Sequence, residues 1–151
     1  MDVTIDGCIC KVDLDNKIGG GSFGAVYAAT SDGEEGAVKR VPKERGAQRE
    51  LLVVEGLGDV PNVVPVHGIG DAGDSWAIVM PHAEQSLCTF LRTAGGPLES
   101  PLALPILLDI AQALVSLKSK GVVHRGPQAQ EHPAAPRSLV PHRLRHLPLR
   151  R

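Results

Sequence analysis

The chain has 151 residues, of which 42% are hydrophobic, and its formal net charge at pH 7 is −1. This length allows one domain with its own core, and the balanced charge gives no reason to expect nucleic acid or a membrane surface as a partner. No apolar run reaches the roughly 18–20 residues that span a bilayer, and the acidic N-terminus does not resemble a secretory signal.

The cysteines are Cys8, Cys10 and Cys88. An odd number without a framework predicts free thiols in a reducing compartment, so we expect a cytoplasmic protein. The Cys8-x-Cys10 spacing could supply half of a metal site, but no Cys or His pair follows at ligand spacing. The simpler interpretation is two small side chains on one face of an extended segment.

The first eighty residues are typical of five strands and one helix. Strands are expected at 11–19, 23–29, 36–41, 63–69 and 75–80. Turn residues fill 31–34 and 70–74, and Pro42, which has no N–H, ends the third strand. The helix is expected over 43–58, because apolar side chains recur in its second half and a glycine closes it.

The next forty residues favour helices. A short helix is expected over 86–93, with Ser86 as its N-cap. A longer one follows, because leucine, alanine and valine recur at helical spacing from Leu104 to Leu117, with Gly121 just past its end. From Gly126 onward prolines and arginines accumulate without any period, which predicts disorder.

The stretch from Ile18 to Tyr27 contains glycines at G-x-G-x-x-G spacing. This motif alone is shared by Rossmann dinucleotide sites and protein kinases, and a glycine-rich hairpin tip can also be purely structural. In a Rossmann unit the glycines open a helix. Here Ala25-Val26-Tyr27 predicts a strand instead, which favours a phosphate-covering loop between two strands.

With the motifs that follow, the chain resembles the N-lobe of a protein kinase and the beginning of its C-lobe, from about residue 11 to 125. The motifs that carry the resemblance are, in chain order, the glycine-rich loop Gly19-x-Gly21-x-Phe23-Gly24-x-Val26, the strand lysine in Ala37-Val38-Lys39, the helix acid Glu50, the strand Ala77-Ile78-Val79-Met80, and Gly121-Val122-Val123-His124-Arg125.

The resemblance implies an α+β fold. A kinase N-lobe, a five-stranded antiparallel sheet plus one helix, is expected over 11–83. The first helices of the C-lobe are expected over 84–125, and the disordered tail over 126–151.

The resemblance also implies ATP as cofactor, with Mg²⁺ usual for the family. It assigns the loop Gly19, Gly20, Gly21, Ser22, Phe23 and Gly24 to the phosphates, and Ile18, Val26 and Ala37 to the adenine faces. Met80 would guard the back of the pocket, and the backbone of Pro81, His82 and Ala83 would form the hinge.

In the same resemblance Lys39 contacts the α- and β-phosphates and Glu50 holds it in place. Either residue alone would be an ordinary solvated charge, and Glu44 or Glu55 could replace Glu50 as the partner.

The resemblance breaks off at the catalytic loop, which in the family reads His-Arg-Asp with an asparagine five residues later. Here His124-Arg125 is followed by Gly126, the asparagine position holds Glu131, and no Asp-Phe-Gly occurs. The catalytic carboxylate and the Mg²⁺ ligands are thus absent from the chain. We expect a truncated domain that does not catalyse transfer.

The residues after Arg125 suggest a reason. Read one base later, their codons can encode Asp-Leu-Lys-Pro-x-Asn-Ile-Leu from Gly126 and Leu-Thr-Asp-Phe-Gly-Ile-Ser from Pro141. We hypothesise that this segment is translated out of frame, through a frameshift, an alternative splice junction or a gene-model error. The lysine two residues after the shifted Asp is typical of Ser/Thr kinases.

Three functions remain open at this stage. The first is an ATP-binding lobe of a Ser/Thr protein kinase whose protein substrate is unknown, inactive as written. The second is a pseudokinase-like interaction module. The third, a basic tail that binds acidic surfaces or nucleic acid, is disfavoured because out-of-frame GC-rich sequence is often rich in Arg and Pro.

Overall fold

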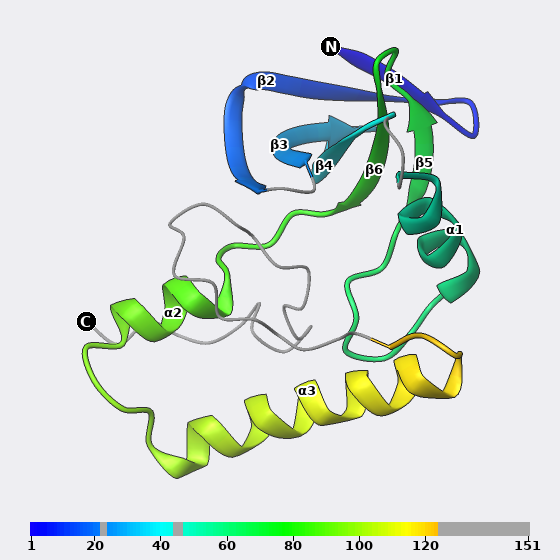
Figure 1. The fold of residues 1–151 in the computed structure, drawn as a ribbon. Coiled ribbons are helices and arrows are strands. Elements are labelled where there is room, and N and C mark those ends of the chain that lie inside the picture. Colours follow the sequence, from blue (N-terminus) through cyan, green and yellow to red (C-terminus); the bar gives the residue numbers. More distant parts are fainter. Residues whose placement is uncertain (22–23, 44–46, 124–151) are drawn as a thin grey trace. The chain divides into compact units, whose positions relative to one another are not determined.

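The computed structural model describes residues 1–21, 24–43 and 47–123, shown in Figure 1. The described residues form two compact units. One comprises Met1–Gly58 and Pro65–His82, and the other comprises Asp59–Val64 and residues 83–123. The tail expected to be disordered, 126–151, lies outside the described residues.

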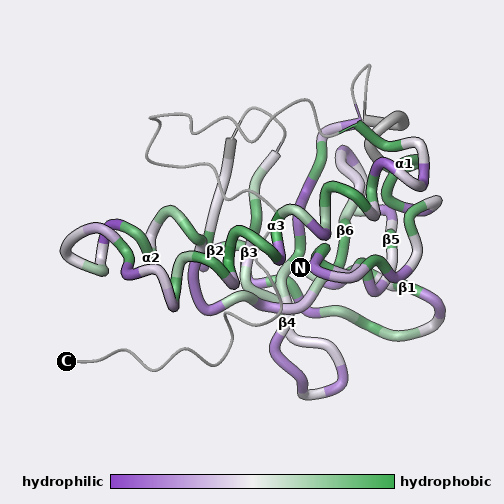
Figure 2. Tube along the Cα trace, turned by 90° about the horizontal axis from the view of Figure 1, so that it is seen from below, coloured by the Kyte–Doolittle hydropathy of each residue, from purple (hydrophilic) through white to green (hydrophobic). Residues whose placement is uncertain are grey.

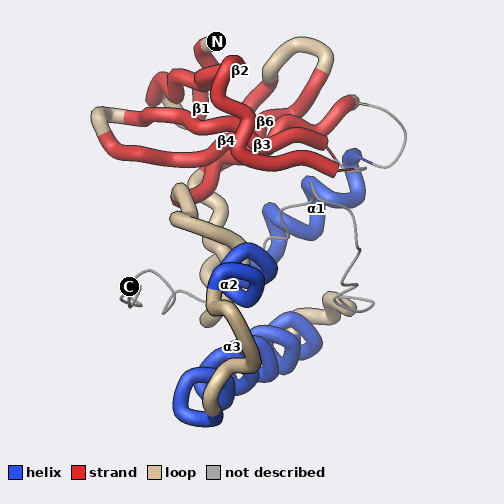
Figure 3. Tube along the Cα trace, turned by 90° about the vertical axis from the view of Figure 1, so that its left-hand side faces the viewer, coloured by secondary structure: helices blue, strands red, loops and turns tan. Residues whose placement is uncertain are grey.

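The first unit contains an antiparallel sheet and the helix α1 (Ala47–Leu57), drawn in red and blue in Figure 3. The sheet has six strands in the spatial order β1-β2-β3-β4-β6-β5. Their bounds are β1 (Asp2–Ile5), β2 (Cys8–Gly21), β3 (Gly24–Ser31), β4 (Glu34–Pro42), β5 (Gly68–Asp71) and β6 (Ser75–Pro81). The α+β class with its antiparallel sheet is confirmed, and β1 is one strand more than the five that we expected.

Two Asp-Gly pairs make the tightest turns of the sheet. Asp6 and Gly7 connect β1 to β2 with φ of 49° and 85°, and Asp32 and Gly33 connect β3 to β4 with φ of 51° and 84°. Positive φ at both central residues matches the right-handed twist of the flanking strands. The first of these turns is what makes β1 possible.

The fourth expected strand, 63–69, is largely wrong. Before β5 the chain turns instead, with Asn62 at φ 61° and the Val63 N–H donating to the Val60 carbonyl at 3.1 Å. His67, expected inside the strand, is exposed and precedes it. Pairing with β6 runs from Gly68 to Asp71, so residues 63–66 are not paired in the described sheet.

Both faces of the sheet are apolar. One face buries Val3, Cys10, Val12, Ala29, Val38, Ala77 and Val79. On the other face Val41 and Ile78 are buried with Leu51 of α1. Because side chains alternate along each strand, neighbours such as Val38 and Lys39 point to opposite faces. The face under α1 is therefore the face that carries Lys39.

The second unit contains two helices, α2 (Leu87–Thr93) and α3 (Ser100–Ser119). Ser86 caps α2 as predicted, since its hydroxyl accepts a hydrogen bond from the Thr89 N–H at 3.1 Å. Gly121 follows α3 with φ 75°, the left-handed conformation that ends helices.

One face of α3 is buried in its unit. Its members are Ile106, Asp109, Ala113 and Leu117. The neighbouring Gln112 accepts a hydrogen bond from Asn62 at 3.0 Å.

Another face of α3 is apolar and exposed, and Figure 2 shows the helix coloured mainly as hydrophobic. Leu104, Leu107, Leu108 and Val115 are 63%, 61%, 58% and 69% exposed. Within the described residues, α3 is the one helix long and apolar enough to cross a bilayer by length and composition. Polar residues interrupt it, so the sequence showed no continuous apolar run.

Candidate functional site

The glycine-rich segment is the tip of the β2–β3 hairpin. In the register of the two strands, Gly19 lies opposite Val26, Gly20 opposite Ala25, and Gly21 opposite Gly24. Ser22 and Phe23, the two remaining loop residues, lie outside the described residues. The hairpin expected from the sequence is therefore present, with strand on both sides of the glycines and no helix after them.

Two of the glycines lie against close neighbours of different kinds. Gly24 has φ 123°, and a Cβ there would overlap the carbonyl oxygen of Arg40 on β4. At Gly20 a Cβ would come within 2.7 Å of Cε of Lys17. Gly24 is therefore held against a strand backbone, whereas Gly20 leaves room for a flexible side chain.

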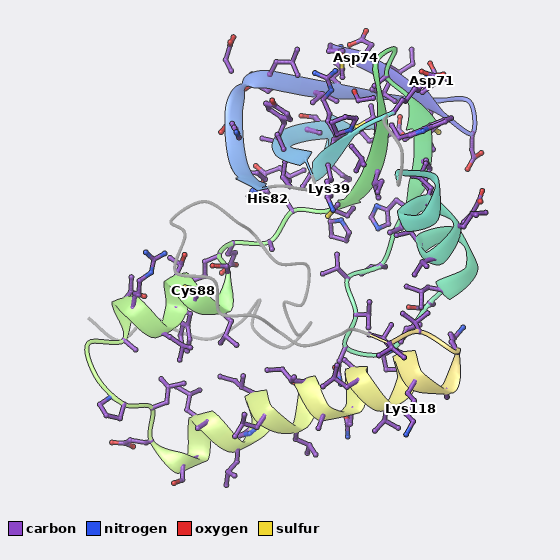
Figure 4. All side chains as sticks on the ribbon, viewed as in Figure 1. Lys39, Asp71, Asp74, His82, Cys88 and Lys118 are labelled. Carbon is purple, nitrogen blue, oxygen red and sulfur yellow. The ribbon has the colours of Figure 1, made fainter. Side chains whose placement is uncertain are left out.

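A row of paired residues crosses the sheet and contains the candidate lysine. Gly19 on β2 pairs with Val26 on β3, Val26 with Lys39 on β4, and Lys39 with Ile78 on β6. Directly paired residues in an antiparallel sheet point to the same face. The glycine hairpin and Lys39, labelled in Figure 4, are thus joined through one intervening strand.

A second row on the same face lies two residues further along. It joins Ala28 to Ala37 and Ala37 to Met80. Ala37 is buried, and Met80 and Val26 are half-buried. Ala28 and Ala37 give this row two small side chains beside Met80. Ile18, expected on the same surface, lies at an irregularity of the β2–β3 pairing and is 40% exposed.

Helix α1 covers the part of this face beside Lys39. Leu51 packs with Val41 and Ile78, the two residues that flank the lysine on β4 and β6. Glu50 precedes Leu51 in α1, but its side chain is not among those described. The Lys39–Glu50 pairing therefore stays a prediction.

The hinge residues follow the strand that ends beside Ala37. Strand β6 ends at Pro81, which pairs with Gly36, and His82 is the last described residue of the first unit. All three expected hinge residues, Pro81, His82 and Ala83, are half-buried. Ala83 begins the longer segment of the second unit.

A charged network at the other end of β6 was not expected from the sequence. Arg40 donates from Nη2 to Asp74 at 2.7 Å and from Nε to the Ser75 hydroxyl at 2.9 Å. Arg40 lies 34 positions before Asp74 and 35 before Ser75, so no local sequence pattern predicts these contacts. The network fastens the β5–β6 turn to the strand that carries Lys39.

Lys43 extends this network. Its ammonium bonds Asp71 at 2.7 Å and lies 4.6 Å from the centroid of the Trp76 ring. Asp71 also accepts the Gly73 N–H at 2.8 Å. The Lys43 hydrogen bond, followed by that of Gly73, lowers the pKa of the Asp71 carboxyl below its usual value. The two bonds hold the turn in one conformation.

The described residues contain no group of three His, Cys, Asp or Glu side chains that could hold a metal ion. Cys8 is exposed and Cys10 is buried, and both are free. Of the family's two Mg²⁺ ligand positions, that of the catalytic-loop asparagine carries Glu131 in this sequence, and Asp-Phe-Gly does not occur in it. The residues present therefore do not fit the family's metal site.

Comparison with known sequences agrees with this geometry. The model of the protein tyrosine and serine/threonine kinase family matches residues 12–131. Cell division control protein 7 of Schizosaccharomyces pombe is 31% identical over 124 residues, which are 76% of this chain and 12% of that protein. Serine/threonine-protein kinase pim-2 of Danio rerio is 31% identical over 136 residues, which are 74% of this chain and 44% of that protein.

A solved structure has the same fold. It is that of Rad53 1-466 in complex with AMP-PNP, with a TM-score of 0.68 and 27% identity, and the match covers 79% of this chain and 33% of that one. The chain thus spans less than half the length of each of these relatives. Because the family model covers most of the sequence, from the strand before the glycine hairpin to beyond His124-Arg125, the chain belongs to the protein kinase family.

Proposed function

We propose that the first unit binds ATP. The glycine hairpin covers the phosphates, Lys39 contacts the α- and β-phosphates, and Ala37 and Val26 pack against the adenine. The observation that carries this proposal is the row Gly19–Val26–Lys39, which brings the hairpin and the ammonium to one face of the sheet. The neighbour solved with AMP-PNP supports it at the level of the fold.

In this proposal the hinge backbone meets the adenine edge. Pro81 offers a carbonyl but no N–H, so the donor must come from a later residue of the hinge. The ammonium of Lys39 supplies a point charge near phosphate oxygens, a contact that gains strength where water is excluded.

Titration with ATP tests the proposal, by calorimetry or by thermal shift. Lys39→Ala should weaken binding at least tenfold, because it removes the one cation placed in the glycine row. Lys11→Ala is the matched control, since Lys11 is exposed near the other end of β2, and it should bind like the parent chain. Absence of saturable binding at millimolar nucleotide would overturn the proposal.

We further propose that this chain binds nucleotide without transferring phosphate. Gly126 has no side chain to accept the proton of a substrate hydroxyl, a contribution of about 10²–10⁴ in rate. The family's metal ligands, which neutralise the developing charge, are missing as well. Transfer of γ-phosphate to a generic protein substrate should stay at the background rate, and transfer above it that Lys39→Ala abolishes would contradict this reading.

The shifted reading frame explains the missing residues. If it is correct, the catalytic loop and the metal motif are encoded by the same nucleic acid but are not translated in this chain. Sequencing the transcript across the codons for His124 to Gly126 tests the idea directly. Expressing the frame-corrected gene should give a Ser/Thr kinase, in keeping with the name of the pim-2 relative. An early stop in the shifted frame would contradict the hypothesis.

A second function, protein interaction without catalysis, is favoured by the exposed apolar face of α3. Leu104 and Leu108 lie one turn apart on that face, and no charged side chain lies between Leu104 and Val115 except the buried Asp109. Binding of a protein partner should survive Lys39→Ala and be lost in Leu108→Lys. The opposite pattern would assign the interaction to the nucleotide face.

A further inference from the structure

Strand β1 lies in the first unit but contributes no residue to the proposed ATP site. It pairs with β2 only, from Asp2 opposite Lys11 to Ile5 opposite Cys8. The Met1 amine donates to the Val12 carbonyl at 2.8 Å, and the Val12 N–H donates to the Met1 carbonyl at 2.7 Å. Val3 is 1% exposed, which is unusual for a side chain on a terminal strand.

The side chains of β1 enter a slot formed by two glycines on β5. Gly68 and Gly70 pair with Val79 and Ala77, so both face the core that contains Val3. A Cβ at Gly68 would overlap Cγ2 of Ile5. At Gly70 a Cβ would come within 2.6 Å of Cγ1 of Val3 and 3.1 Å of the Thr4 carbonyl oxygen. Only glycine at these two positions lets β1 lie against β5.

β1 therefore connects the two ends of the sheet. It is the first strand in the spatial order β1-β2-β3-β4-β6-β5, and β5 is the last. Closing the sheet in this way buries Cys10 and Val79, which belong to the cluster under β1. If Val3 and Ile5 leave the slot, the cluster loses the side chains that cover it on the β1 side.

This closure reaches the glycine hairpin through β2. β2 is one strand from Cys8 to Gly21, but its pairing with β3 is interrupted between Val12 and Lys17. The half before the interruption is held from both sides, since Cys10 pairs with Val3 and with Ser31. The half that carries the glycines is paired to β3 alone. The held half therefore sets the direction in which the glycine half extends.

We propose that Val3 and Ile5 are positioning residues for the glycine-rich hairpin: by filling the slot at Gly68 and Gly70 they close the sheet and fix the strand that carries the glycines. The effect on nucleotide affinity rests on the proposed ATP site, whereas the closure of the sheet does not. When these side chains leave the slot, the core around Cys10 opens, the glycine ends of β2 and β3 loosen, and nucleotide binding weakens although no residue of the site has changed.

Alkylation of Cys10 measures the closure without nucleotide. Cys10 is 2% exposed under Val3, while Cys8 and Cys88 are exposed and serve as internal references for reagent reactivity. Gly68→Ala should raise the alkylation rate of Cys10 at least tenfold relative to the references. Gly96→Ala, at a glycine with open space around it, is the matched control and should leave the rate unchanged.

A double-variant cycle tests the slot itself. Ile5→Ala removes Cγ2, the atom that a Cβ at Gly68 would overlap, and leaves Cβ of Ile5 at 3.6 Å. Gly68→Ala should therefore be less harmful in the Ile5→Ala background than in the parent chain. If Gly68→Ala alone does not fold, Ile5→Ala, which overlaps nothing, still reports the loss of the contact.

The same variants are measured for ATP affinity by calorimetry and for hydrogen exchange over residues 19–24. We expect Gly68→Ala to weaken binding at least threefold and to speed exchange in the hairpin, and the double variant to recover part of both. Faster Cys10 alkylation with unchanged exchange at 19–24 would overturn the positioning role. If the parent chain binds no ATP, the proposed function fails, and the alkylation and exchange data still decide the proposal about β1.

Discussion

The last glycine of the hairpin should matter for folding more than for phosphate contact, and Gly24→Ala tests this. Gly24 has φ 123°, where an L-residue costs about 1–3 kcal/mol. Its Cβ would also overlap the Arg40 carbonyl, part of a central strand that cannot shift without breaking its pairing, and forced overpacking costs about 1–3 kcal/mol. The sum is a loss of about 2–6 kcal/mol of unfolding free energy.

Variants at two other glycines separate the cost of the positive φ from the cost of the Cβ overlap. Gly33 has φ 84° with nothing within 4 Å of a built Cβ, so Gly33→Ala should lose only the backbone part, about 1–2 kcal/mol. Gly20→Ala should be nearly neutral, because the Lys17 stem can move aside and the added methyl restricts the unfolded chain.

Urea unfolding midpoints at constant m-value measure all three variants. Equal losses for Gly24→Ala and Gly33→Ala would refute the overlap as the reason for glycine at this position.

Three further outcomes follow from the packing and the charges. Lys43 and Gly73 lower the pKa of the Asp71 carboxyl in the folded protein. The stabilisation from this carboxylate is therefore present above its unfolded pKa and is lost as pH falls through the lowered folded pKa. The loss of stability on acidification, followed by circular dichroism from pH 6 to 2, should be smaller in Lys43→Met. Val38 is fully buried on the central strand, so Val38→Ala should cost about 2–3 kcal/mol in urea unfolding, and a loss below about 1 kcal/mol would mean that the core collapses around the gap. Ser86→Ala removes the N-cap of α2 and should lower the stability of this helix by about 1 kcal/mol, measured as faster hydrogen exchange over Leu87–Thr93. The control Ser119→Ala, at the far end of α3, should leave that exchange unchanged.

Much of the local structure could be predicted from residues close together in the chain. The Asp32-Gly33 turn, the strand end at Pro42, the Ser86 cap and the glycine after α3 each depend on the conformation of a few neighbouring residues. The family motifs are equally local, because each requires particular side chains at fixed spacing. This is why the fold class and the family were readable before any coordinates.

Strand β1 shows where the sequence interpretation fell short. The Asp6-Gly7 pair is the same hairpin signal as Asp32-Gly33, and its flanks alternate, so a sixth strand was within reach of the sequence. The error at β5 is different in kind. Valines at 63–66 look like a strand, but a strand forms only where another strand pairs with it, and β6 pairs from Gly68 onward.

The sequence by itself determined the family, the hairpin character of the glycine segment, and the absence of the catalytic carboxylate and metal ligands, because these are statements about which side chains are present and in what order. Only the tertiary structure decided that Lys39 shares a row with Gly19, that Gly24 is pressed against the Arg40 carbonyl, and that Val3 and Ile5 fill the gap above two glycines of β5. These contacts join residues far apart in the chain, and their geometry follows from strand order and register, which no local pattern encodes.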